Sequence, residues 1–282
     1  MHGIFEEKID RILIEIKKRG RSWRSIFLLD QYGYSAVTIR TLQNIFQNLP
    51  FAEVILTFAV DSLIDYMANS TECKNMLQNL GLAYDLSNLE NDKQQKNWRS
   101  VIQFRLYREL VDNAGARYYT NFFIKSSEST RSYWLLHLSM HSKAKDEMQA
   151  LHWSLENHFV SEGKAGLNML AYDPKRDVDF TRQPSFFFNE SDKEKNQKAL
   201  LGQLPALIPS NGISVGEFYN IHCNQTTATF KMICSALQEL YLHEEIEVRL
   251  MSGKSKKKGS KIDAHDFIKP ASQLIFPFCS SH

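Results

Sequence analysis

Apolar residues at the start of the chain recur at helical spacing. The positions that set this pattern are Phe5, Ile9, Ile12, Leu13 and Ile16. They predict an amphipathic helix that ends near Gly20. The next apolar residues form one continuous run, SIFLLD at Ser25–Asp30, which is closed by an acid and a turn. Such a run is typical of a central strand that is covered on both faces.

A strand-helix-strand unit is predicted from the segments that follow. Val37–Gln47 has a helical pattern, and Glu53–Val60 reads EVILTFAV, a second run typical of a parallel strand. The helix between the two runs has the length that a right-handed crossover needs. We therefore expect an α/β fold in which 25–30 and 53–60 are parallel strands of one sheet.

The same sheet is expected to continue after a helical segment. Helical patterns within residues 62–115 predict an inserted helical subdomain or lid. Tyr118–Lys125 and Tyr133–Ser139 are aromatic-rich and predict an antiparallel hairpin, and a helix is expected at about Ser142–His158. Together these elements predict a partial Rossmann-like sheet within residues 1–165.

The C-terminal third has the clearest architecture. Three helices are expected, at about Lys193–Leu204, Val215–His222 and Thr226–Glu244, the last with Asn224 as its N-cap. Two strands, Glu247–Met251 and Gln273–Phe276, are expected to follow and to form a wing. This order predicts a winged-helix domain over residues 193–282, joined to the first domain by a connector with short strands at 166–192.

Composition limits the remaining choices. The chain of 282 residues has a formal charge of only +2, so affinity for polyanions must come from local clusters of Lys and Arg. The four cysteines are scattered without a C-x-x-C pair, which favours free thiols and gives no zinc motif. Neither a secretory signal nor a run long enough to span a bilayer is present, so we expect a cytoplasmic protein without a metal site.

One local cluster of positive charge lies between the two expected strands of the wing. The flexible segment GKSKKKGSK contains Lys254, Lys256, Lys257, Lys258 and Lys261. In a winged helix this loop lies beside the nucleic-acid backbone, where each phosphate contact releases counterions. A solvated loop that only keeps the protein soluble is the alternative.

The third helix of the predicted domain is the second candidate contact. Gln225, Thr226, Thr229 and Lys231 are expected near its leading end, which lies in the major groove when such a domain reads DNA. This set contains neither Arg nor Asn, so it predicts little base-specific recognition. A contact with another protein explains the helix equally well.

Several motifs resemble the three-Cys-motif partner (TcmP) family of bacteria and phages. They are FLLDQYGYSAV at Phe27–Val37, EVILTF at Glu53–Phe58 and SYWLLHLSMHSKAKDEM at Ser132–Met148, followed by the winged helix. The resemblance implies a class I methyltransferase-like domain and a radical-SAM-like partner protein with three cysteines.

The resemblance also implies a substrate site after the first strand. Asp30 and Tyr32 match the acid and the aromatic residue of the methyltransferase motif that binds a target amine, and Gln31 stands where the family has proline. Gln31 and Gly33 belong to the pocket that this motif implies. Asp61, just after the second strand, lies where α/β proteins bind ligands, although a helix N-cap would explain it as well.

The half of the family's fold that binds the cofactor has no counterpart in the sequence. No G-x-G occurs anywhere in the chain, so S-adenosylmethionine is expected to bind only when a partner or a missing segment completes the sheet. The strand at 25–30 would then have a bare edge, which we expect a protein partner or a second copy to cover. Two functions follow: a split or degenerate methyltransferase-like component that acts on a base amine, or an inert adaptor that brings a partner enzyme to nucleic acid, most simply DNA.

Overall fold

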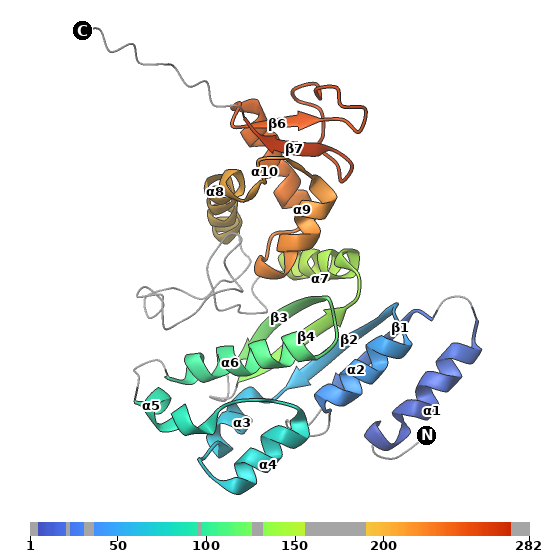
Figure 1. The fold of residues 1–282 in the computed structure, drawn as a ribbon, viewed down its shortest axis with the longest axis vertical. Helices are drawn as coiled ribbons and strands as arrows, with labels where there is room; N and C mark the ends of the chain where they lie inside the picture. The colour runs from blue at the N-terminus through green and yellow to red at the C-terminus, as the bar shows by residue number, and fades with distance from the viewer. Residues whose placement is uncertain are drawn as a thin grey trace. The chain divides into compact units, whose positions relative to one another are not determined.

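The computed structural model describes residues 5–20, 23–30, 37–94, 98–125, 132–155 and 190–271 (Figure 1). These residues divide into two compact units, one ending at Lys193 and one beginning at Glu194. The α-helices of the first unit are α1 (Phe5–Lys18), α2 (Ile39–Asn48), α3 (Val60–Tyr66), α4 (Thr71–Leu80), α5 (Leu89–Lys93), α6 (Trp98–Asn113) and α7 (Ser142–Leu155). Its strands are β1 (Ser25–Asp30), β2 (Ala52–Phe58), β3 (Tyr118–Lys125) and β4 (Ser132–Ser139).

The first unit contains a four-stranded mixed sheet in the order β1-β2-β4-β3. β1 and β2 are parallel, with Ser25 opposite Ala52, and the crossover between them contains α2. β4 is antiparallel to both β2 and β3. The predicted parallel pair and the predicted hairpin are therefore both confirmed, and the unit has a mixed α/β fold.

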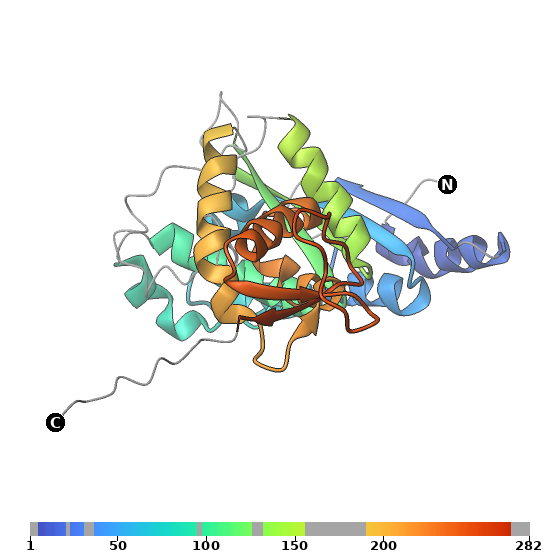
Figure 2. The ribbon, with the colours of Figure 1, turned by 90° about the horizontal axis from the view of Figure 1, so that it is seen from above.

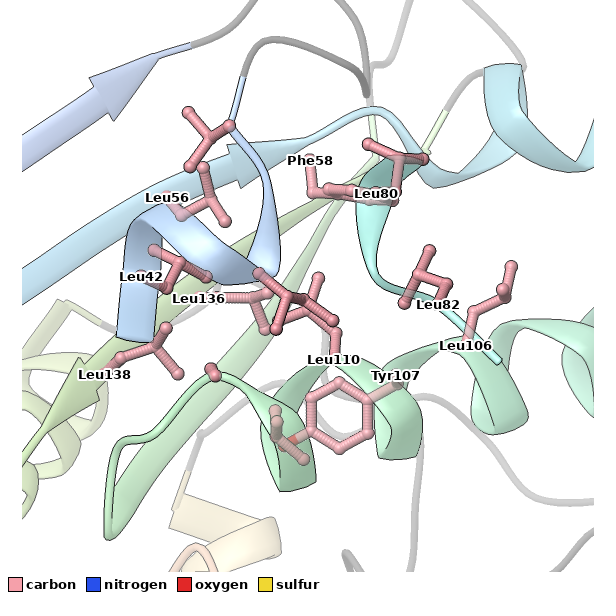
Figure 3. Close-up of a cluster of buried hydrophobic side chains, with 14 of the residues drawn as sticks. Leu42, Leu56, Phe58, Leu80, Leu82, Leu106, Tyr107, Leu110, Leu136 and Leu138 are labelled. Atoms are coloured by element: carbon pink, nitrogen blue, oxygen red, sulfur yellow. The ribbon is translucent and has the colours of Figure 1, made fainter. Parts of the chain in front are cut away.

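One face of this sheet carries the hydrophobic core. Figure 3 shows side chains from β2, β4 and α2 gathered with those of α4 and α6, among them Leu42, Leu56, Phe58, Leu80, Leu106, Tyr107, Leu110, Leu136 and Leu138. The predicted helical segment at 62–115 belongs to this same core, because Leu63 and Leu106 are fully buried in it. These helices therefore contribute to the core that covers this face of the sheet.

The opposite face of the sheet is only partly covered. α7 packs on β3 and β4. On β1, however, Ile26 is 64% exposed and Leu28 is 72% exposed, whereas Phe27 and Leu29 are buried in the core. The prediction that SIFLLD is covered on both faces is therefore wrong, because only alternate residues of the run are buried.

The second unit is a small helical domain with a three-stranded sheet. It contains α8 (Glu190–Leu207, whose first turn precedes the boundary), β5 (Ile213–Ser214), α9 (Val215–His222), the 3-10 turn η3 (Cys223–Gln225), α10 (Phe230–Leu242), β6 (Ile246–Arg249) and β7 (Phe267–Pro270). The sheet order is β5-β7-β6, all antiparallel, and Figure 2 shows β6 and β7 side by side. Three helices followed by a two-stranded wing confirm the winged helix.

Two details of the predicted winged helix are wrong. The strand that pairs with β6 is 267–270, whereas the predicted one, 273–276, lies outside the described residues. The third helix begins at Phe230 and has Thr229 as its N-cap, so Asn224 lies in η3 and does not cap it. None of the described helices has both the length and the apolar character that a bilayer crossing requires.

Candidate nucleic-acid interface

The segment between β6 and β7 is an ordered wing. The Leu250 amide donates to the Lys254 carbonyl at 2.9 Å, which closes a tight turn after β6, and the Lys256 amide returns to the Val248 carbonyl at 2.9 Å. Gly253 in this turn and Gly259 in the next one have φ values of 78° and 84°, a region that glycine adopts without strain. The basic run is therefore divided between two turns that backbone hydrogen bonds and glycine conformations define.

Lys256 stabilises the wing through a buried ion pair. Its side chain is 9% exposed, and its Nζ donates to Oδ2 of Asp266 at 2.6 Å and lies 3.6 Å from Oδ2 of Asp263. Its carbonyl accepts a hydrogen bond from the Tyr241 hydroxyl of α10. Burial opposes the charge of Lys256, but the hydrogen bond and the charge of Asp266 outweigh it and raise the pKa of Lys256. The prediction that Lys256 binds phosphate is therefore wrong for this fold, because its charge is already neutralised.

The other four lysines of the wing are exposed. Lys258 forms an ion pair with Glu244, and the hydrogen bond and the charge of Lys258 lower the pKa of Glu244. Lys254, Lys257 and Lys261 form no ion pair within the described part of the chain. These three ammonium groups are thus free to bind an anion. Lys258 can bind an anion as well while it remains paired with Glu244.

The leading end of α10 offers fewer contacts than predicted. Thr226 is fully buried, and its Oγ1 accepts from the Ala228 amide at 3.0 Å. Thr229 is 8% exposed, and its Oγ1 accepts from the Met232 amide at 3.2 Å as the N-cap of α10. Both hydroxyls therefore support the backbone, and only Gln225 and Lys231 of the predicted set are exposed.

The cap gives a direct stability prediction. We expect Thr229→Ala to lower the free energy of unfolding of the C-terminal unit by about 1 kcal/mol, because the Met232 amide loses its partner. Thr229→Ser keeps the oxygen and should stay within about 0.5 kcal/mol of wild type. Native-state hydrogen exchange of the α10 amides measures both, and equal exchange in the two variants would show that the hydroxyl does not stabilise the helix.

Three residues that were not predicted lie next to the wing. Arg249, Met251 and His265 line an open hollow of about 580 Å³ beside the start of α9. Met251 is 82% exposed, and the Arg249 guanidinium forms an ion pair with Glu247 at 2.9 Å. They are close to the basic run in sequence, and the fold brings them together around one hollow.

The candidate substrate site in the first unit is described only in part. Asp30 is exposed at the carboxyl end of β1, and its Oδ1 accepts a hydrogen bond from Thr57 Oγ1 of β2 at 2.6 Å. Gln31, Tyr32 and Gly33 lie outside the described residues. Asp61 is the second residue of α3, whose N-cap is Ala59, so the N-cap alternative for Asp61 is wrong.

The described residues at this edge do not fit S-adenosylmethionine. The cofactor would need backbone amides of a glycine-rich turn and a carboxylate for its ribose. β2 runs through Ala59 directly into α3, and no glycine-rich turn lies between them.

Comparison with known proteins gives one match. Residues 171–253 match the family described as GMT-like wHTH domain. No curated protein and no solved structure matches the chain. The match ends inside the wing, at Gly253, and supports a winged helix in the C-terminal part of the chain, a kind of domain that commonly binds nucleic acid.

Proposed function

We propose that this protein binds nucleic acid, most simply DNA, through phosphate contacts of its wing. The observation that supports this function most directly is the set of exposed, unpaired lysines Lys254, Lys257 and Lys261 on a wing that is fixed by Lys256. Since the wing is ordered before binding, little conformational entropy is lost when its lysines meet phosphate.

The binding that we propose is largely independent of base sequence. α10 contains neither Arg nor Asn, and of the predicted contacts near its start only Gln225 and Lys231 are exposed, so few side chains are available for bidentate contacts with base edges. Phosphate contacts fix position on the duplex but carry no sequence information. The protein therefore acts as an adaptor that holds its first unit, or a partner of that unit, on nucleic acid.

Replacing the three free lysines tests this function. In Lys254→Gln/Lys257→Gln/Lys261→Gln, we expect affinity for a DNA duplex of arbitrary sequence to fall about 100-fold at 0.15 M salt. Three phosphate contacts are lost, and each contributes about 0.9 to the slope of log K against log salt. The slope of log K against log salt should become shallower by about 2.7. Fluorescence anisotropy titrations at several salt concentrations measure both quantities.

The matched control removes the same charge elsewhere. Lys18, Lys74 and Lys143 are exposed lysines of the first unit, and replacing all three by Gln changes the net charge equally. This control should keep the wild-type slope. If the control and the wing variant lose affinity alike, the wing has no special role and the proposed interface is wrong.

A second candidate function rests on Asp30. Its carboxylate, held by Thr57 at the carboxyl end of a parallel strand, could accept hydrogen bonds from the amine of a base, as the resemblance to methyltransferase-like partner proteins implies. In that case the chain is one component of a base-amine methyltransferase whose cofactor half comes from another chain, such as a three-Cys-motif protein.

Asp30→Ala separates the two candidates. An adaptor keeps its DNA affinity in this variant, because Asp30 is remote in sequence from the wing and belongs to the other unit. A methyltransferase component shows transfer of labelled methyl groups from S-adenosylmethionine to DNA when the partner is added, and loses it in Asp30→Ala. Absence of any transfer with the partner would leave only the adaptor.

A further inference from the structure

The outer edge of β1 is open. In the part of the chain that the structure describes, β1 is the last strand of the sheet and pairs only with β2. A strand edge presents a row of unpaired amides and carbonyls, which natural proteins protect with Lys, Pro or a covering element. β1 contains neither Lys nor Pro. Among the described residues, the free amides and carbonyls of β1 can therefore pair with a further strand, and the strand itself contains no protecting residue.

The exposed face of the same strand is apolar in its middle and charged at its ends. Residues 26, 28 and 30 of β1 are exposed, and they point to one side because side chains alternate along a strand; residue 24, which immediately precedes the strand, is also exposed. Arg24 begins this series and Asp30 ends it, with Ile26 and Leu28 between them. Ile55 of β2, which lies opposite Leu28, extends the apolar strip inward. With Arg24 at one end and Asp30 at the other, the strip is complementary in charge to the same strip of a second copy that runs antiparallel to it.

We propose that two copies of this chain pair through β1, antiparallel, with Phe27 opposite Phe27 of the second copy. This register places Ile26 against Leu28 of the second copy, and Leu28 against its Ile26. It also places Arg24 against Asp30 at both ends of the joined strands. The two sheets become one continuous sheet, and the apolar strips of the two copies meet on one face.

Other registers are less favourable. A shift by one residue turns the exposed face of one copy to the core side of the other, because the side-chain period is two. The shift that places Leu28 opposite Leu28 brings Ile26 against the carboxylate of Asp30 and leaves both Arg24 side chains without a partner. The shift in the other direction places Arg24 against Leu28. Only the proposed register pairs both charges and both apolar residues.

None of the described elements around β1 pairs with this edge. α1 packs on the core face of the sheet, where Ile9 and Leu13 are buried and Phe5 contacts Phe27 with ring centroids 6.5 Å apart. Asp30 accepts a hydrogen bond from Thr57 with Oδ1, and its carboxylate has capacity for an additional donor. Arg24 is exposed and forms no ion pair within the described residues. The inference concerns the first unit alone and does not depend on nucleic-acid binding.

A charge swap tests both the pairing and its register. Light scattering and sedimentation of the full chain should show a dimer that dissociates in the micromolar range, as is usual for a small interface. Arg24→Asp and Asp30→Arg each place like charges opposite one another at two symmetric positions, and each should weaken the dimer at least about tenfold. The double variant Arg24→Asp/Asp30→Arg restores both ion pairs with reversed polarity and should return to within about threefold of wild type.

Two further measurements show whether β1 itself forms the interface. Leu28→Lys should give a monomer, whereas Leu151→Lys, at an exposed apolar position on α7, should leave the dimer intact. Hydrogen exchange should show the outward-pointing amides of β1 protected in the dimer and exposed in Leu28→Lys. A monomeric wild type at about 100 µM overturns the proposal. So does a dimer that the single charge reversals leave unchanged, or one that the double variant fails to restore.

Discussion

In Asp266→Ala we expect the C-terminal unit to lose about 3 kcal/mol of unfolding free energy, because removing one partner of a buried ion pair leaves the other uncompensated. Asp266 is 2% exposed, and its Oδ2 accepts from Lys256 Nζ at 2.6 Å and from the Asp263 amide at 2.7 Å. The alanine variant leaves a buried ammonium and an unpaired amide inside the wing.

The neighbouring carboxylate is the matched control. The Asp263 side chain is 57% exposed and lies 3.6 Å from Lys256 Nζ, so Asp263→Ala should lower the unfolding free energy by less than about 1 kcal/mol. Hydrogen exchange of amides in β6 and β7 measures the stability of this unit separately, which a single unfolding curve of a chain with two units does not. Equal losses in the two variants would show that burial of Asp266 is unimportant.

A double variant connects this ion pair with function. Lys256→Met/Asp266→Leu replaces the pair by apolar side chains and should recover most of the stability that Asp266→Ala loses. Because Lys256 faces Asp266 and not the solvent, the double variant should also keep the DNA affinity of wild type within about threefold. A loss as large as that of the three-lysine variant would mean that Lys256 does contact phosphate.

The helices and strands were largely predictable, whereas the residues within them that are free to bind were not. Helical periodicity placed α1, α2 and α9 within one or two residues, since burial of one helix face imposes a regular spacing, and continuous apolar runs placed β1 and β2 as closely. A continuous apolar run such as SIFLLD has no such spacing, so the sequence did not show that Ile26 and Leu28 are exposed. β5 was missed because a two-residue strand has no period at all.

In the candidate site, too, the sequence did not show which individual side chains are free to bind. Nothing in a run of lysines shows that Lys256 reaches Asp266, because that contact depends on two turns with glycine at positive φ. Likewise the segment from Asn224 to Thr229 contains several side chains that can cap a helix, and only packing selects Thr229. The basic character of the wing was evident from sequence, but the three lysines available to a ligand were not.

The polar side of α7 is another feature that periodicity did not predict. Lys145, Gln149 and His152 lie on one face of this helix and are buried, whereas Leu151 is 47% exposed. β4 contributes the buried His137, whose Nε2 lies 2.9 Å from Oε2 of Glu53. An interior with this many ionisable groups makes the stability of the first unit depend on pH.

We expect the first unit to lose about 3 kcal/mol of unfolding free energy when the pH falls from 6.5 to 4, mainly through His152. Burial and then the positive charge of His137 lower the pKa of His152 to about 3. Burial also lowers the pKa of His137, although Glu53 opposes the shift. Above pH 6.5 both states of the protein hold neutral His152, so it contributes no pH dependence there. Below pH 6.5 His152 binds a proton in the unfolded chain but not in the folded unit. The free energy of unfolding therefore falls by about 1.4 kcal/mol per pH unit until the pH reaches the pKa of His152 in the folded unit.

Tryptophan fluorescence isolates this effect, because all four tryptophans of the chain precede residue 154 and the winged helix has none. Urea unfolding curves recorded from pH 7 to pH 4 should show a falling midpoint in wild type and a flatter dependence in His152→Gln. His141→Gln is the matched control, because His141 lies just before α7, is exposed and stacks on Phe51. This variant should keep the wild-type dependence of the midpoint on pH. A wild-type midpoint that does not change over this range would mean that His152 takes up its proton in the folded state, and that water reaches the polar layer beneath α7.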